Sequence, residues 1–209
     1  MDGLLKLIES RRSVRRFKAR PVPKEDILKM INAASTAPSG SNQQNWHFTI
    51  VTDEKTKALM RCAVEEAVRD ILSKTGSKKA QEEISSYSRY FTFFSGAPCV
   101  ICVSEKPYDS LIHRLLVKYD SQAQNRSSSG IQGVAAAIEN LLLAAHALGY
   151  GTCWMTGPLV AKKQLEKILK ISPPDSLAAL VPVGIPESIP AMPPRKPAEE
   201  IVKFILKTP

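Results

Sequence analysis

The chain has 209 residues, 44% of them hydrophobic and 23% charged, with 29 Lys and Arg residues against 20 Asp and Glu residues. This length and composition are typical of one globular domain over residues 1–209, and they exclude a fold whose core depends on disulfide or metal staples. The formal net charge of +9 favours anionic ligands such as phosphorylated cofactors, pyridine nucleotides or, less specifically, nucleic acid.

The apolar segments do not suit a membrane span. The longest run, Val134–Leu148, is interrupted by Glu139, Asn140 and His146, and no apolar signal segment is evident near the N-terminus. We therefore expect a soluble cytoplasmic protein with no membrane partner.

Helical and strand patterns alternate along the first part of the chain. The predicted elements are a helix at Asp2–Ser10, a helix from Pro23 to near Ala37, a strand at Trp46–Val51, a helix from Asp53 towards Leu72, a surface loop at Ser73–Ala80, a helix at Glu82–Phe94, a strand around Cys99–Val103 and a possible helix at Leu111–Tyr119. Within residues 105–130, the tract Gln122–Gly130 lacks apolar periodicity. The segment 105–130 is therefore interpreted as a mobile cover that selects the substrate.

The second part of the chain centres on an Ala- and Leu-rich helix at Gly133–Leu148. Because this helix is apolar nearly all round, it must be covered on most sides, and it is placed at the centre of the fold and at a dimer interface. The elements predicted after it are an extended piece at Tyr150–Met155, a helix from Pro158 to Lys170, a strand at Leu177–Val183 and a last helix at Ala198–Leu206. The order of elements indicates an α+β fold without repeats.

Two of the four cysteines, Cys99 and Cys102, have the C-x-x-C spacing of a redox pair or of half a zinc site. They lie in a predicted strand, however, and side chains three residues apart on a strand point to opposite faces. No second cysteine pair or histidine pair completes a zinc site. Buried structural thiols are favoured, and no metal is expected.

Six Lys and Arg residues fall between Arg11 and Arg20, with Ser13 among them, and Arg195 follows far along the chain. Arginine forks hold phosphate oxygens in a bidentate manner, so the cluster suits a phosphate. The alternative is a solvated basic helix end.

The loop from Pro38 to Gln44 carries hydroxyl and amide side chains, and Gly40 allows a close approach of the backbone to a ligand. These groups match the carbonyls and ring nitrogens of an isoalloxazine, although a plain polar turn is the alternative. A third segment, Gly149–Pro158, is either a turn after a buried helix or, if a flavin is present, a source of N–H groups at Thr156 and Gly157 for flavin N5.

Taken together, these segments resemble the FMN-dependent nitroreductase family. The resemblance rests on Arg-Arg-Ser-x-Arg at residues 11–15, the Pro-Ser-x-x-Asn-x-Gln-x-Trp loop at residues 38–46, Leu-Gly-x-Gly-Thr-Cys-Trp at residues 148–154 and Pro-x-Arg-x-Pro at residues 193–197. It implies an α+β homodimer with a central mixed or antiparallel sheet flanked by helices and a domain-swapped arm. It also implies FMN at the subunit interface, reduced by NADH or NADPH in a ping-pong cycle.

The resemblance also implies roles for single residues. Phosphate and pyrimidine-edge contacts would come from Arg11, Arg12, Ser13, Arg15 and Arg195. The partner subunit would contribute Pro38, Ser39, Gly40, Ser41, Asn42 and Gln44, and the ring would lie against Trp154, Met155, Thr156 and Gly157. Asn45 stands where proline is usual, which predicts a less rigid loop, and Arg89 is the candidate flavin contact from the helix before Cys99.

The leading hypothesis is therefore an FMN oxidoreductase that passes hydride from NAD(P)H to a nitroaromatic, a quinone or a similar small conjugated acceptor. No side chain need act as nucleophile or general base, and His47, His113 and His146 are interpreted as structural. A dehalogenating or flavin-fragmenting member of the family is an alternative. A basic nucleic-acid-binding protein is a third reading, disfavoured because no helix-turn-helix or RNA-binding motif is visible.

Overall fold

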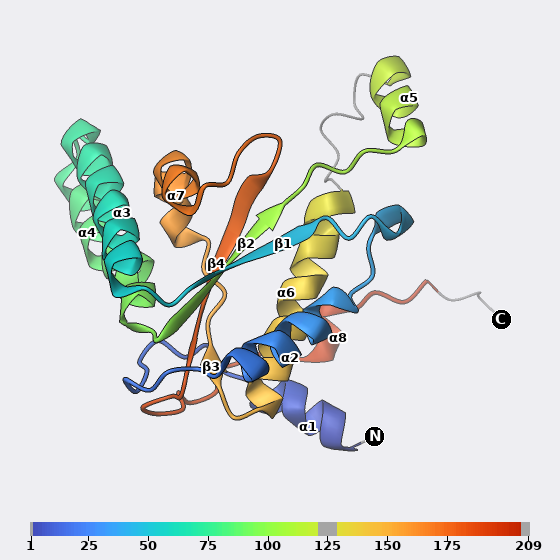
Figure 1. Ribbon diagram of the computed structural model, residues 1–209, viewed down its shortest axis with the longest axis horizontal. Helices are drawn as coiled ribbons and strands as arrows, with labels where there is room; N and C mark the ends of the chain where they lie inside the picture. Colours follow the sequence, from blue (N-terminus) through green and yellow to red (C-terminus); the bar gives the residue numbers. More distant parts are fainter. Residues whose placement is uncertain (1, 121–128, 206–209) are drawn as a thin grey trace.

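The computed structural model describes residues 2–120 and 129–205. Its centre is a four-stranded sheet with the strand order β1-β2-β4-β3, and every neighbouring pair is antiparallel. Figure 1 shows helices on both faces of this sheet. The predicted α+β class with a flanked central sheet is confirmed.

Four segments of very different length make the sheet: β1 (Trp46–Val51), β2 (Cys99–Glu105), β3 (Gly151–Thr152) and β4 (Ser176–Gly184). Trp46 lies opposite Glu105, and Cys99 lies opposite Val183, with a register shift between Val103 and Ser104. β2 is therefore paired along both edges, which places it at the middle of the sheet.

Both faces of β2 are buried. Cys99, Ile101 and Val103 belong to one hydrophobic cluster, whereas Val100 and Cys102 belong to another. The two thiols thus face opposite sides of the sheet, as predicted from their spacing. Burial raises the pKa of each to about 12, so both stay protonated near neutral pH.

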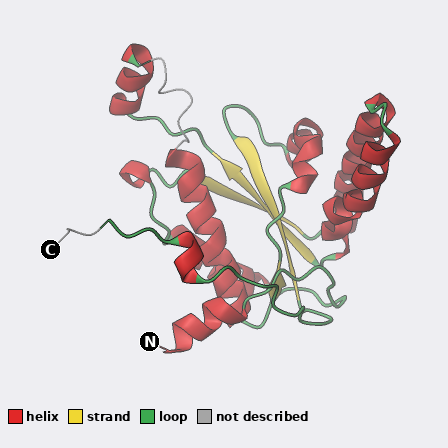
Figure 2. Cartoon of the chain, turned by 180° about the vertical axis from the view of Figure 1, so that it is seen from behind, coloured by secondary structure: helices red, strands yellow, loops and turns green. Residues whose placement is uncertain are grey.

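Each face of the sheet carries its own set of helices. On one side lie α2 (Lys24–Ser35) and α6 (Ser129–Ala147), whose apolar side chains pack on the cluster that contains Cys99. On the other side, α3 (Glu54–Lys74) and α7 (Lys162–Leu169) cover the cluster that contains Cys102. The same arrangement is visible from behind in Figure 2.

The predicted central helix is confirmed as a core element. α6 buries residues along its whole length, including Val134, Ile138 and Leu141, each no more than 1% exposed. None of the helices within residues 2–120 and 129–205 is long and apolar enough to cross a membrane.

Four further α-helices are peripheral: α1 (Asp2–Ser10), α4 (Lys78–Thr92), α5 (Leu111–Tyr119) and α8 (Ala198–Ile201). The short 3-10 helices are η1 (Gly40–Asn42), η2 (Phe93–Gly96) and η4 (Gly157–Ala161), of which η2 and η4 contribute Phe94 and Ala161 to the cluster that contains Cys102. α4 packs along α3, and α5 projects away from the body of the molecule (Figure 1).

Several boundaries differ from the sequence predictions. α6 begins at Ser129 rather than Gly133, only Gly151–Thr152 of the extended piece forms a strand, and the helix expected from Pro158 to Lys170 is divided into η4 and α7. The loop expected at Ser73–Ala80 shrinks to residues 75–77, because the Ser77 hydroxyl caps α4 and the helix begins four residues earlier than predicted. The last helix ends at Ile201, and Leu206 lies outside the described residues. Residues 121–128 of the expected cover also lie outside them.

Candidate functional site

The turn from Cys153 to Gly157 forms one wall of a cavity of ≈ 380 Å³. Arg15 lines the same cavity, and the opposite wall comes from aromatic side chains at the end of α4 and the start of η2. The complete lining is Arg15, Tyr87, Tyr90, Phe91, Phe93, Cys153, Trp154, Met155, Thr156 and Gly157. All five of the residues predicted to contact a flavin ring from the Arg15 and Trp154–Gly157 segments therefore meet at one place.

Backbone pairing explains how Arg15 reaches this turn. Val14 N donates to Thr152 O at 2.8 Å, so the arginine-rich segment runs alongside β3, and Ser13 pairs with Thr152 in parallel. A Cβ on Gly151 would lie 2.7 Å from the Val14 side chain. Glycine is thus required there for the two segments to approach so closely.

The far side of the turn is fixed by β4. Met155 N donates to Leu180 O at 2.9 Å, and Leu180 N donates to Met155 O at 3.0 Å. η4 begins two residues later, at Gly157, with Pro158 in its first turn. Pro158 has no N–H and Leu159 N donates to Thr156 O at 2.9 Å, so the backbone donors at this end of the turn are Thr156 N and Gly157 N.

Sequence reasoning missed the aromatic wall. Tyr87 lies 5.4 Å from Tyr90 and 5.6 Å from Phe91 between ring centroids, and a Cβ added to Gly157 would overlap the Phe91 ring. The signal was present in the sequence, since these aromatics recur at i, i+3 and i+4 of a helix, but nothing linked them to a turn some 65 residues away.

Arg89, the predicted flavin contact on α4, does not line the cavity. Its guanidinium lies 5.0 Å from the centroid of the Tyr90 ring, and it borders a separate hollow between α3 and α4. Arg15 lies 5.9 Å from the same ring centroid, so the α4 side chains that face the predicted site are Tyr87, Tyr90 and Phe91 rather than Arg89.

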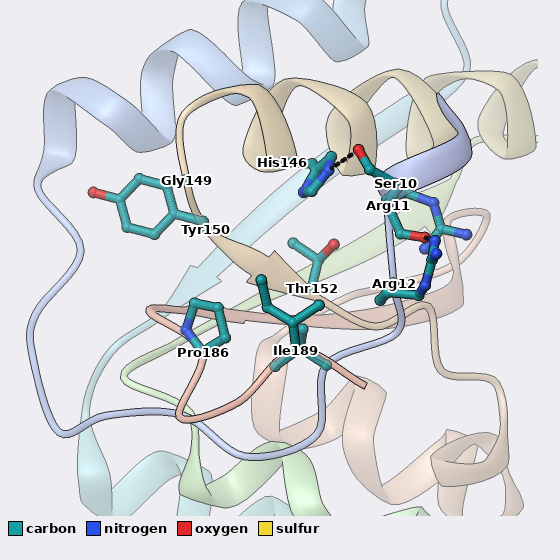
Figure 3. A pocket seen from close by; sticks show the side chains of 11 residues that line it. Ser10, Arg11, Arg12, His146, Gly149, Tyr150, Thr152, Pro186 and Ile189 are labelled. Atoms are coloured by element: carbon teal, nitrogen blue, oxygen red, sulfur yellow. Dashed lines mark hydrogen bonds between the residues drawn. The ribbon is translucent and has the colours of Figure 1, made fainter. Parts of the chain in front are cut away.

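Arg11 and Arg12, predicted to bind a phosphate, line a second and smaller hollow of ≈ 100 Å³. Figure 3 shows them with Ser10 and His146 at its rim. Arg11 Nε lies 3.7 Å from Glu139 Oε1, and Arg12 Nη1 donates to the carbonyls of Glu9 and Arg11 at 2.5 and 2.8 Å. Both guanidinium groups therefore have partners within the chain.

His146 is part of the same hollow. Its Nε2 lies 2.8 Å from Ser10 Oγ, and burial, followed by the charges of Arg11 and Arg12, lowers the pKa of the imidazole below its ordinary 6.5.

Because the unfolded chain takes up this proton at a higher pH than the folded chain, we expect stability to fall as the pH drops below about 6.5. His146→Gln should remove that part of the pH dependence, measured as the urea midpoint between about pH 5 and 8. Identical pH profiles for the two proteins would contradict the assignment.

The loop predicted to contribute in trans lies on the α6 side of the sheet. A Cβ on Gly133 of α6 would lie 3.3 Å from Ser39 Cβ, and the loop residues do not border the Arg15 cavity. Arg195 is exposed in the segment after β4. Within one subunit, therefore, neither the residues of this loop nor Arg195 border the Arg15 cavity, whereas the Ser13 side chain contacts Cys153 in its wall.

Asn45 anchors the loop instead of loosening it. This residue is 2% exposed, and its Nδ2 donates to Lys106 O at 2.9 Å and to Pro107 O at 3.3 Å. Proline at this position would offer no such donor. Among the described residues, no group of three His, Cys, Asp or Glu side chains could hold a metal ion.

Comparison with known proteins gives a consistent result. A family model described as the nitroreductase family matches residues 8–185. The fold is similar to that of a BluB-like flavoprotein from Clostridium difficile 630, with 34% identity, a TM-score of 0.89 and coverage of 97% of this chain and 98% of that one. It is also similar to oxidized iodotyrosine deiodinase bound to FMN and 3-iodo-L-tyrosine, with 26% identity, a TM-score of 0.71 and coverage of 98% and 97%.

One sequence relative comes from Archaeoglobus fulgidus. It is provisionally named NADH dehydrogenase/NAD(P)H nitroreductase and is 30% identical over 198 residues, which cover 90% of this chain and 80% of the relative.

Proposed function

The chain belongs to the nitroreductase family, and from this premise we propose that it is an FMN-dependent oxidoreductase that transfers hydride from NADH or NADPH to a nitroaromatic, a quinone or a similar small conjugated acceptor. One observation carries the proposal: Arg15 and the turn from Trp154 to Gly157 line a single cavity. Its volume of ≈ 380 Å³ lies within the range of about 300–1,000 Å³ that is usual for ligand sites.

The chemistry of the lining fits FMN. The cavity combines a guanidinium for the carbonyl edge of the ring, N–H donors at the start of η4 and aromatic side chains for a planar system. Cys153 is buried there, and burial raises the pKa of its thiol, which leaves it neutral. When bound, FMN supplies the group that accepts hydride at N5 and passes electrons onward.

The protein's own residues would bind and orient the cofactor. We assign the phosphate to the guanidinium groups of Arg11, Arg12 and Arg195 and to the hydroxyl of Ser13. We assign the ring to Arg15, Trp154, Met155, Thr156 and Gly157. No side chain is required to act as nucleophile or general base.

A ping-pong order follows if nicotinamide and acceptor use the same face of the ring in turn. Double-reciprocal plots at several fixed acceptor concentrations should then give parallel lines. Intersecting lines would indicate that both substrates bind together and would contradict the shared cavity.

We also propose a homodimer in which the loop residues Pro38, Ser39, Gly40, Ser41, Asn42 and Gln44 reach the partner's cavity. Apolar side chains are exposed on α1 and within residues 201–205, among them Leu4 at 62%, Phe204 at 72% and Ile205 at 90%. Patches of this kind mark interfaces, and a permanent dimer commonly buries about 2,000 Å² or more. Light scattering at micromolar concentration should give twice the mass of the chain. A monomer would remove the partner loop from the proposed site.

Dehalogenation is the second candidate, favoured by the likeness to a deiodinase with bound 3-iodo-L-tyrosine. The walls made by Tyr87, Tyr90 and Phe91 would stack on a halogenated aromatic ring as well as on a nitroaromatic one. Release of halide from a halotyrosine under reducing conditions, measured against reduction of a nitroaromatic by the same preparation, separates the two activities.

A further inference from the structure

We propose that residues 106–110, the strap, hold residues 38–44, the flavin loop, in the conformation that binds FMN, and that Tyr108 and Gln43 are positioning residues for this cofactor. The inference rests on the proposed function, because it assumes that the flavin loop contacts FMN. It extends that function by assigning a role to residues outside the predicted cofactor contacts.

The flavin loop has an unfavourable backbone conformation. Ser41, Asn42 and Gln44 have φ values of 50°, 53° and 49°, in the left-handed region that residues other than glycine rarely adopt. Such residues are strained and persist only where the surrounding structure enforces their conformation. The loop has hydrogen bonds of its own, such as Gln44 N to Ser39 Oγ at 3.0 Å, and contacts from outside the loop add to them.

The strap provides that stabilisation through side-chain contacts. Gln43 makes a pair of hydrogen bonds with the backbone of Asp109: its Nε2 donates to Asp109 O, and its Oε1 accepts from Asp109 N at 3.1 Å. Tyr108 Oη lies 3.1 Å from Ser41 Oγ. Hydroxyl groups of Ser110 and then Ser41 lower the pKa of Tyr108, which agrees with a phenol oxygen that accepts hydrogen bonds.

Packing reinforces these hydrogen bonds. A Cβ on Gly40 would lie 2.9 Å from Tyr108 Cε2 and 3.0 Å from Ser129 Cβ. Gly40 does not itself have a positive φ, so its role is to let the Tyr108 ring approach the backbone. The loop is thus pressed between the strap on one side and the start of α6 on the other.

The start of the strap is held in place by hydrogen bonds with Asn45, the residue that follows Gln44 of the loop. Lys106 N donates to Asn45 O at 2.7 Å, and Asn45 Nδ2 donates to two strap carbonyls. Asn45 Oδ1 is buried and has no hydrogen-bond donor among the described residues. The Asn45 side chain therefore supplies hydrogen bonds to the strap carbonyls, while its own Oδ1 accepts none from the described residues.

The strap leads directly into α5, so α5 is connected to the flavin loop through the strap. α5 has no buried residue, and Ile112 and Tyr119 are 70% and 75% exposed. Contacts made by α5 therefore act on the flavin loop through a short, hydrogen-bonded connection. If the loop visits its binding conformation only part of the time, FMN affinity falls by the same fraction.

The test compares Gln43→Ala, Tyr108→Ala and Tyr108→Phe with Tyr119→Ala, a matched control that removes an exposed tyrosine of α5 beyond the strap. Amide hydrogen exchange is followed over residues 38–46 in the protein without FMN, and the FMN dissociation constant is measured by quenching of flavin fluorescence. Gln43→Ala and Tyr108→Ala should exchange faster in the loop and bind FMN about 10-fold more weakly, as expected if the competent fraction falls to about one tenth.

Tyr108→Phe should lie close to the wild type, because it keeps the ring against Gly40 and loses one hydrogen bond. Tyr119→Ala should match the wild type in both measurements. Unchanged exchange in Gln43→Ala and Tyr108→Ala would overturn the proposal, and so would faster exchange with an unchanged FMN dissociation constant. If Tyr108→Ala does not fold, loop exchange and FMN affinity of Gln43→Ala are sufficient to test the proposal.

A wild-type protein that fails to bind FMN would overturn the proposed function and the coupling to FMN together. In that case, the rates of amide hydrogen exchange in the variants would still show whether the strap stabilises residues 38–44. The two failures are therefore distinguishable.

Discussion

Replacing Arg15 by alanine is expected to weaken FMN binding roughly 10- to 150-fold, which corresponds to about 1.5–3 kcal/mol for hydrogen bonds to a charged group. Arg15 lines the cavity beside Thr156 and Gly157. Its Nη1 makes a long hydrogen bond of 3.3 Å to Ser13 O, which leaves the guanidinium available to a ligand. Titration of FMN with the purified variant measures the effect.

Arg16→Ala is the matched control for this experiment. It removes the same charge from the adjacent position, but Arg16 does not border the cavity. FMN binding to the control should stay within a few-fold of the wild type, since a single exposed charge contributes little through screened solvent. Equal weakening by both variants would indicate a diffuse effect of net charge and would remove Arg15 from the site.

Replacing Gly157 by alanine is expected to destabilise the protein by about 1–3 kcal/mol, the usual cost of forcing an extra methyl group into a packed position. The new Cβ would overlap the Phe91 ring, and Phe91 is itself packed against the core cluster that includes Met155. Urea unfolding monitored by circular dichroism gives the loss in free energy of unfolding.

Gly96→Ala serves as the control, because a Cβ there meets no atom within 4 Å. It should change stability by no more than about 0.5 kcal/mol. In the double variant Gly157→Ala/Phe91→Ala, the destabilisation should be less than the sum of the two single effects, since the methyl group then finds room. Additive losses would show that Gly157 and Phe91 do not contact one another.

Local order along the chain was predictable because it depends on neighbouring residues. The limits of α1, β1 and α5 agree with the predictions from apolar spacing, and α6 was recognised as central from its uniform apolarity. The start of α4 differs from the prediction because a serine cap followed by two lysines looks like a surface loop in sequence. The strand order β1-β2-β4-β3 had no local signal at all.

The residues of the candidate site also divide into those that the sequence predicts and those that only the fold brings together. Arg15 and the turn from Trp154 to Gly157 were found because each belongs to a contiguous motif. Tyr90 and Tyr108 were missed because their importance lies in contacts with residues far away in sequence, such as the 5.9 Å approach of Arg15 to the Tyr90 ring. No periodicity reports such a contact, and only the folded chain brings the partners together.

Anaerobic addition of NADH or NADPH to the FMN-loaded protein tests the proposed oxidoreductase most directly. We predict that the flavin absorbance is lost with at least one of the two nucleotides and returns when a nitroaromatic or a quinone is added. A protein that retains FMN while its absorbance stays unchanged with both nucleotides would contradict the proposed hydride transfer from NAD(P)H.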